Sequence, residues 1–452
     1  MMLDIEKTMQ IVKKAVSFSK SDMCEAVLEH QRLSLTRFAE SRISDNIDTT
    51  ETILYIRSVK DKKIGVTATG DLAEPGIRRA VEDSEKIMSY MAPDEKFVSL
   101  PGPGEKTPEG KFMIPATERF GPKERAQIVE KIGMVGRKGN LKASGAFRIE
   151  HNGLAVANSL GLERFFMGNN AQLSLTMSGE NGNSGWAMEF NKDASQIDFH
   201  SISKKATEKA AQSLNPVTIE DGQYTVILEP AAVGQLLLLL SFMGFGCKTF
   251  YQNRSFMAGK LGEKIAGENF SVMEDADDPD FNYCPFDYEG VLRKSVPLID
   301  KGIATGVVYN SYYANLMNAA ATGHALPATN NYGPYPKTLS VAPGDSRIEE
   351  MIKSTEKGVL ITHFWYLNFL NPMRTMVTGT TLDGTFLIEN GAISHPIKNM
   401  RTNQSILEAF SNIEMISFDR VIYPQYSVLM KVPAMKINNF NLAAEEEDDS
   451  KC

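Results

Sequence analysis

The sequence predicts an α+β protein, with helices and a mixed sheet in the N-terminal region and a β-rich, mainly antiparallel C-terminal domain that contains one buried helix. Two observations lead to this prediction. Helical and strand-like apolar patterns alternate before residue 216, whereas short apolar runs separated by glycines dominate from Tyr224 onward. The long apolar segment 231–247 falls short of the roughly 20 residues that a bilayer requires, so we expect it to form the buried helix.

Residues 1–100 are expected to form the first domain. Apolar residues recur at helical spacing over 9–18, which predicts an amphipathic helix. Segments 52–59 and 64–69 are rich in β-branched and aromatic residues and are separated by a short polar turn, which predicts a β-hairpin. A second helix is expected over 77–91, because its apolar residues share one face and a proline precedes it.

The segment 100–110 is crowded with proline and glycine and is the clearest linker in the chain. A central domain, packed against the first, is expected over 112–216. It begins with a helix that starts near Pro122, continues with two paired strands within 171–190, and closes with a helix over 203–214. The linker therefore predicts a boundary between two parts of the N-terminal region.

The C-terminal domain is expected over 220–441, followed by an acidic, disordered tail over 442–452. The net charge of −8 and the lack of basic runs argue against nucleic-acid binding, which requires clustered Lys and Arg. The four cysteines are far apart and form no C-x-x-C pair, which indicates reduced thiols. Neither a secretory signal nor a membrane-length segment is evident, so the sequence predicts a cytoplasmic protein.

Short motifs occur in a fixed order along nearly the whole chain. They are KIGVTATGDL at 63–72, VANSLGLE at 156–163, TVILEP at 225–230, LGEKIA at 261–266, PLIDKG at 297–302 and DGTFLIENG at 383–391. A single motif would be weak evidence, but the ordered set is specific. It resembles the TldD/PmbA family, also called the microcin-processing or modulator-of-DNA-gyrase family.

The resemblance implies a zinc peptidase whose metal site lies on a helix with the motif H-E-x-x-x-H, completed by a cysteine near the C-terminus. In such a site imidazoles and a thiolate hold zinc, the metal lowers the pKa of a bound water, and the glutamate acts as general base. Here the corresponding positions are Leu238, Leu239 and Met243, and the segment 419–425 has no cysteine. Leucine cannot ligate zinc and methionine is a poor zinc ligand. We therefore expect no catalytic residue and no metal on this chain, and zinc on a TldD-like partner.

The resemblance thus implies a non-catalytic, PmbA/TldE-like subunit. It would pair with a metal-bearing TldD-like subunit and take part in the proteolysis or maturation of extended or unfolded peptides. The alternative is a homodimeric binding or modulator protein without peptidase activity. An independent hydrolase is a third interpretation, but the sequence shows neither a G-x-S-x-G elbow nor a nucleotide-binding glycine motif.

Residues around the most specific family motif are the candidates for a substrate cleft. Their alternative role is structural, since single histidines and aromatic residues more often orient strands. The leucine run 236–240 likewise predicts a helix buried on all sides, with packing of one side on a partner as the alternative. The candidate cleft residues are His363, Trp365, Tyr366, Asp383, Glu389, Asn390 and His395.

Overall fold

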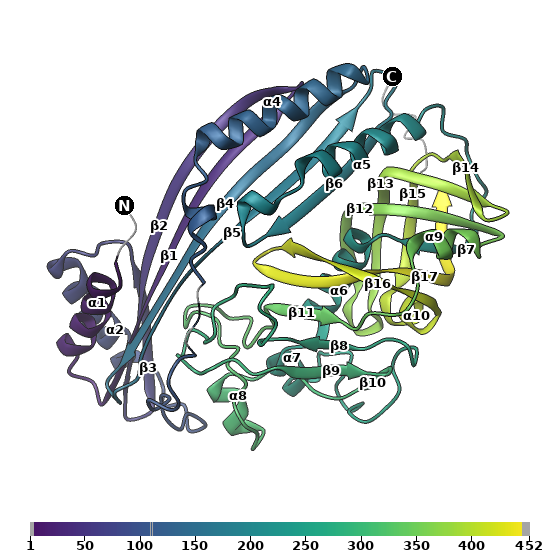
Figure 1. Ribbon diagram of the computed structural model, residues 1–452. Coiled ribbons are helices and arrows are strands. Elements are labelled where there is room, and N and C mark those ends of the chain that lie inside the picture. The colour runs from purple at the N-terminus through teal and green to yellow at the C-terminus, as the bar shows by residue number, and fades with distance from the viewer. Residues whose placement is uncertain (1–3, 109, 111, 445–452) are drawn as a thin grey trace, which may run out of the picture.

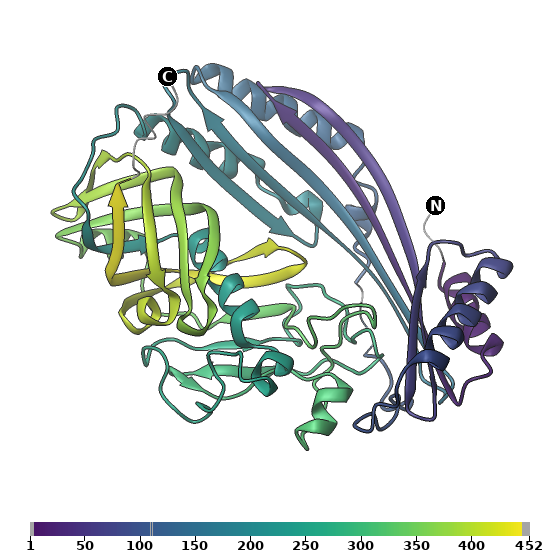
Figure 2. The same cartoon turned by 180° about the vertical axis from the view of Figure 1, so that it is seen from behind.

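The computed structural model describes residues 4–108, 110 and 112–444 and confirms the α+β class. Two sheets dominate this part of the chain. A long, curved sheet from the N-terminal half wraps around the C-terminal half, which is built on a second sheet (Figure 1; Figure 2 shows the reverse side).

The N-terminal sheet has six strands in the order β3-β2-β1-β4-β5-β6. All of its described pairings are antiparallel. Parallel pairings, which we expected in the mixed sheet of this region, occur in the C-terminal sheet. Neighbouring strands run in opposite directions because short turns connect most of them. The strands are β1 (Met23–Ala39), β2 (Arg42–Lys60), β3 (Lys63–Thr69), β4 (Lys142–Asn158), β5 (Glu163–Ser178) and β6 (Ser184–Asn191).

Alternation of side chains along these strands separates two faces. On β4, Phe147 and Ala155 belong to the two cores that lie under the helices of this half. Leu154 and Val156 point to the other face and pack with Phe286 of the C-terminal half. The helices are α1 (Ile5–Phe18), α2 (Glu74–Tyr90), α3 (Pro115–Glu118), α4 (Pro122–Lys138) and α5 (Phe199–Gln212), with the 3₁₀ turn η1 (Ala194–Gln196).

The C-terminal sheet is mainly antiparallel, as expected, with parallel pairing of β11 with β17 and of β12 with β7. Its order is β10-β9-β8-β11-β17-β15-β13-β12-β7, with β14 on β13 and β16 on β17. The strands are β7 (Gly222–Leu228), β8 (Val272–Glu274), β9 (Val296–Asp300), β10 (Ile303–Ala304), β11 (Thr338–Val341), β12 (Lys357–Asn371), β13 (Met376–Glu389), β14 (Ala392–Pro396), β15 (Met400–Ser405), β16 (Ile413–Gln425) and β17 (Val428–Ala444).

The predicted buried helix is confirmed as α6 (Pro230–Gly244), which packs against β7, β12, β16 and β17. Pro230 suits the first helical position, where no backbone N–H is needed. No helix in the described part of the chain is long and apolar enough to cross a membrane. The remaining helical segments are α7 (Cys247–Tyr251), α8 (Ser311–Leu316), η2 (Pro372–Arg374), α9 (Ile348–Lys353) and α10 (Ile406–Ser411).

The segments on either side of the predicted linker 100–110 contribute to the same sheet, because β4 pairs with β1 along most of its length. At the other end of the chain, β17 continues to Ala444 and so includes the first residues of the predicted tail. The rest of that tail, 445–452, lies outside the described residues.

Candidate functional site

Helix α6 carries the three positions at which the family resemblance implies metal and base residues. Leu238 and Met243 are 2% and 3% exposed and belong to the large apolar core of the C-terminal half. Leu239 is partly buried and packs against the same core. Among the residues that the structure describes, no group of three or more His, Cys, Asp and Glu side chains could hold a metal ion. The residues present at these positions do not fit zinc, so no catalytic step through a metal follows from them.

Polar contacts of Gln235 and Ser241 connect α6 to its surroundings. The Gln235 amide donates to the carbonyl oxygen of Phe364 at 2.9 Å and accepts from the backbone N–H of Phe364 at 2.7 Å. The hydroxyl groups of Ser241 and Tyr335 form a hydrogen bond, and Phe242 stacks on the Tyr335 ring with 5.0 Å between centroids. Tyr335 in turn lines a cavity, so the helix lies next to that cavity.

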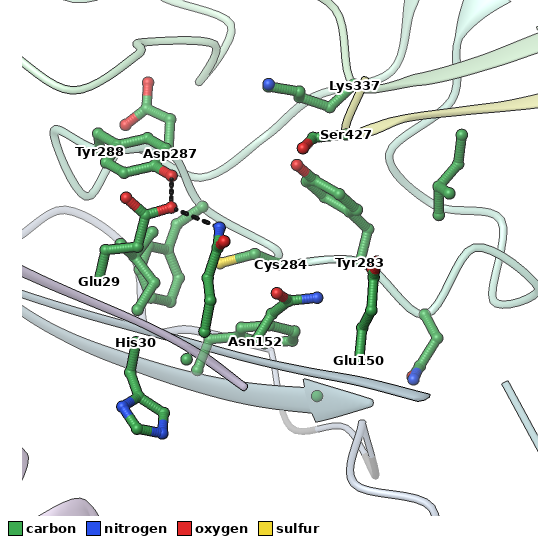
Figure 3. Close-up of a pocket in the computed structure, with 18 of the residues that line it drawn as sticks. Glu29, His30, Glu150, Asn152, Tyr283, Cys284, Asp287, Tyr288, Lys337 and Ser427 are labelled. Carbon is green, nitrogen blue, oxygen red and sulfur yellow. Dashed lines mark hydrogen bonds between the residues drawn. The ribbon is translucent and has the colours of Figure 1, made fainter. Parts of the chain in front are cut away.

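The cavity has a volume of about 320 Å³ and lies between the N-terminal sheet and the C-terminal half (Figure 3). On β1, Val27 packs on the C-terminal half. Glu29 and Gln31 follow on the same face of the strand and therefore reach the cavity. His30 lies on the opposite face, where its Nδ1 is 2.8 Å from the Thr52 hydroxyl, and its ring points away from the cavity. Polar lining residues include Glu29, Gln31, Glu150 and Asn152 from the strands and Tyr283, Tyr288, Lys337 and Ser427 from the C-terminal half.

Glu29 supplies a carboxylate on the strand side of the cavity. It accepts hydrogen bonds from the hydroxyl of Tyr288 at 2.5 Å, the amide of Gln31 at 3.0 Å and the hydroxyl of Tyr55 at 3.2 Å. Burial and the nearby Glu29 charge raise the pKa of Tyr55 to about 12, so this hydroxyl remains a donor at neutral pH. All three partners are neutral, and the described residues place no cation in contact with Glu29.

Lys337 supplies an ammonium group across the cavity from Glu29, beside Ser427 (Figure 3). Its Nζ lies 5.7 Å from the centre of the Tyr335 ring and forms no hydrogen bond or ion pair with the residues that the structure describes. Burial and the charge of Arg293 lower the pKa of Lys337 to about 8, and the charge of Glu29 opposes this effect. The group remains mostly protonated at neutral pH.

A buried ionic network fixes the wall behind Lys337. The Glu274 carboxylate accepts hydrogen bonds from the backbone N–H groups of Lys337 and Thr338, at 2.9 and 3.0 Å, and from the Thr338 hydroxyl at 2.8 Å. It also forms an ion pair with Arg293 and lies 3.1 Å from the Nε2 of His324. These contacts hold the backbone at Lys337, from which its side chain extends along the cavity wall.

The structure brings together two of the seven cleft candidates in a contact between the two halves of the chain. The Nε2 of His363 lies 3.1 Å from the Oδ2 of Asp383, and the His363 ring packs on Trp186 of β6 at 4.8 Å. Burial raises the pKa of Asp383, but hydrogen bonds from His363 and Ser184 outweigh it, so the net pKa is lowered.

The other five candidates lie elsewhere on the surface. Trp365 and Tyr366 are 62% and 78% exposed. Glu389 and Asn390 lie at the turn between β13 and β14, and His395 is 3.9 Å from Glu389. None of the seven candidates lines the cavity of Figure 3. The cavity residues were not predicted from the sequence. A usable signal was present, because Glu150 and Asn152 share strand alternation with the buried Leu154.

Two family models match the chain. One describes the PmbA/TldA metallopeptidase C-terminal domain and matches residues 221–444, and the other describes domain 1 of the same metallopeptidases and matches residues 24–87. The chain belongs to the PmbA/TldD family. This family of TldD/TldE-type metallopeptidases is the one that the ordered motifs resemble, so that prediction is confirmed.

Individual relatives of the PmbA/TldD family are distant. A metalloprotease of Methanothermobacter thermautotrophicus is 24% identical over 233 residues, which are 49% of this chain and 49% of that protein. The chain spans about half the length of the curated metalloproteases it matches.

Solved structures align over nearly the whole chain. TldE from Thermococcus kodakarensis has a TM-score of 0.86 at 23% identity, covering 96% of this chain and 99% of that one. A putative modulator of a DNA gyrase from Thermotoga maritima has a TM-score of 0.85 at 19% identity, with coverage of 96% and 99%. At these identities the likeness shows the fold alone.

Proposed function

We propose that this chain is a non-catalytic subunit of a TldD/TldE-type metallopeptidase and that it pairs with a metal-bearing TldD-like subunit. The observation that carries the proposal is the set of apolar residues at Leu238, Leu239 and Met243 on a helix that is otherwise retained. Two of these side chains are packed in the core, where an unpaired imidazole would lose its hydrogen bonds to water. The helix is therefore adapted to packing and not to metal chemistry.

An exposed apolar segment supports the presence of a partner. Over residues 365–373, at the far end of β12 and the turn that follows, five large apolar side chains are between 41% and 78% exposed. Large exposed apolar patches on soluble proteins mark interaction surfaces. The exposed residues of this segment are Trp365, Tyr366, Phe369, Leu370 and Met373.

Edge strands support a role in contacting extended substrates. Strand β6 pairs with β5 alone in the N-terminal sheet, so it is an edge of that sheet. Strand addition recognises an extended peptide through main-chain hydrogen bonds and tolerates varied sequences. We infer that the chain contributes surface of this kind to the peptidase complex.

Co-expression with a TldD-like chain from the same genome tests the proposal. We expect a stable complex by size-exclusion chromatography with light scattering, and peptide cleavage that requires both chains. The double variant W365S/Y366S should weaken the complex, whereas Y90S, which alters the 80% exposed Tyr90 on α2, is the matched control. The proposal fails if no complex forms and cleavage does not depend on this chain. A stable homodimer without such a complex would favour the modulator alternative.

A further inference from the structure

The cavity between the two halves contains several charged groups, and most of them are already paired. Arg148 contacts Glu150 at 2.8 Å, and Arg32 contacts Asp48 at 2.6 Å outside the cavity. Asp287 is buried and accepts hydrogen bonds from the backbone N–H groups of Glu289, Val291 and Ala325. Arg293 is paired with Glu274 in the wall described above. These groups leave little net charge for a ligand to compensate.

Glu29 and Lys337 also contact only neutral groups within the described part of the chain, but they are partly exposed, whereas Asp287 is 4% exposed. Three neutral donors bind the Glu29 carboxylate, and the Lys337 ammonium faces the cavity beside an aromatic ring. Placing a charge away from bulk water without a counter-ion is unfavourable, and a ligand of opposite charge reduces that cost. The two walls therefore favour a negative group at Lys337 and a positive group at Glu29.

Size and neutral polar groups define the ligand further. At about 320 Å³ the cavity is at the lower end of the roughly 300–1,000 Å³ that is typical of small-molecule sites. The Tyr283 hydroxyl and the Asn152 amide line it without hydrogen bonds to any described residue, so both can bind a polar ligand. A simple anion would be repelled by Glu29, and a simple cation by Lys337.

We propose that this cavity binds a small zwitterion with one ammonium and one carboxylate group, of the class of free amino acids and dipeptides. Lys337 would bind the carboxylate and Glu29 the ammonium, while Tyr283 and Asn152 bind the polar groups between them. Binding at this site does not require a metal-bearing partner. A failure of this inference would therefore leave the proposed subunit role unaffected, and a failure of the subunit role would leave this inference unaffected.

Isothermal titration calorimetry on the full chain, with alanine and dialanine as the two arms, tests this inference. We expect one ligand to bind per chain. Whichever of alanine and dialanine binds more tightly shows whether the site accommodates a single amino acid or a dipeptide better. N-acetyl-dialanine lacks the ammonium, dialanine amide lacks the carboxylate, and each should bind at least tenfold more weakly than dialanine. The variant K337Q should weaken dialanine binding at least tenfold and should affect dialanine amide much less.

Two further variants complete the design. E29Q should weaken binding of dialanine and leave N-acetyl-dialanine nearly unchanged, and K353Q, at the exposed end of α9, is the matched control that should bind normally. Circular dichroism shows whether each variant is folded. If a variant is unfolded, the comparison of dialanine with N-acetyl-dialanine and dialanine amide on the unaltered chain still tests the inference. The inference is overturned if no zwitterion binds at millimolar concentration, if the blocked ligands bind as well as dialanine, or if folded K337Q binds normally.

Discussion

At the scale of single residues, the buried polar side chains of the C-terminal half depend on dense local networks. His324 illustrates this, because it is 2% exposed, its Nδ1 lies 2.9 Å from the Thr322 hydroxyl, and its Nε2 faces Glu274. Although Glu274 is close, Arg293 and Thr338 already occupy that carboxylate. Burial, reinforced by the charge of Arg293, lowers the pKa of His324 well below its ordinary value of 6.5.

A lowered histidine pKa in the folded state predicts the pH dependence of stability. The unfolded chain takes up a proton at His324 below pH 6.5, whereas the folded chain does so only at lower pH, so stability is lost as the pH falls between the two values. The free energy of unfolding should fall there by up to about 1.4 kcal/mol per pH unit from this group. Urea unfolding of H324N should show a smaller slope, and H200N, at the exposed His200, is the control.

Burial also lowers the pKa of His30 and His151, so part of the slope should persist in H324N. An unchanged slope in H324N would contradict the assignment.

The candidate site residues were only partly predictable from the sequence at this scale. The motif identified Leu238 and Met243, and their burial agrees with their apolar character. Glu29 and Lys337 could not be identified, because nothing local marks them among the other charged residues. They face the same cavity because a strand of one sheet packs on a loop beside the other, an arrangement that no residue spacing encodes.

At the scale of elements, the sequence predicts long periodic segments well and exposed strands poorly. The hairpin expected from 52–59 and 64–69 is present, but β2 begins at Arg42. Its first ten residues are almost all exposed, so they show no apolar alternation and are held by hydrogen bonding to β1. Helix α6 was predictable because its apolar run is long and bounded by Pro230 and a glycine.

The packing of α6 makes a specific prediction at Gly234. A methyl group at this position would lie 2.6 Å from the Tyr423 ring, so the ring or the helix must shift. We expect G234A to lower the free energy of unfolding by about 1–3 kcal/mol, despite the higher helix propensity of alanine. Denaturant unfolding measures this effect.

A double-mutant cycle provides the control for this prediction. In a Y423A background the two ring contacts are removed and only the contact with the Cβ of residue 423, at 3.2 Å, remains, so G234A should cost much less than in the unaltered chain. Equal costs in both backgrounds would show that Tyr423 is not the reason for a glycine at this position.

At the scale of the whole molecule, charged and aromatic contacts join the two halves of the chain. Arg57 of β2 contacts Glu25 of β1 at 2.8 Å and Glu289 of the C-terminal half at 3.2 Å, and all three side chains are largely buried. His363 and Asp383 form a second connection against β6. The sequence could predict the two halves but not their contacts, because partners such as Arg57 and Glu289 are far apart along the chain.

Removing Arg57 should destabilise the junction strongly. R57M leaves two buried carboxylates without their cation, for which we expect a loss of about 3–5 kcal/mol in the free energy of unfolding. Calorimetric or denaturant unfolding checks this value, with R79M at the exposed Arg79 as control. Adding E25Q and E289Q to R57M should recover part of the loss, and a loss no larger than that of R79M would contradict the prediction.

We propose that the helix corresponding to the family's metal site packs as core in this chain and holds no metal of its own. The most direct test is the zinc content of the purified chain, measured by plasma mass spectrometry after exposure to zinc and desalting. The apolar packing of Leu238 and Met243 predicts zinc far below one equivalent. One tightly bound zinc ion per chain would contradict this proposal.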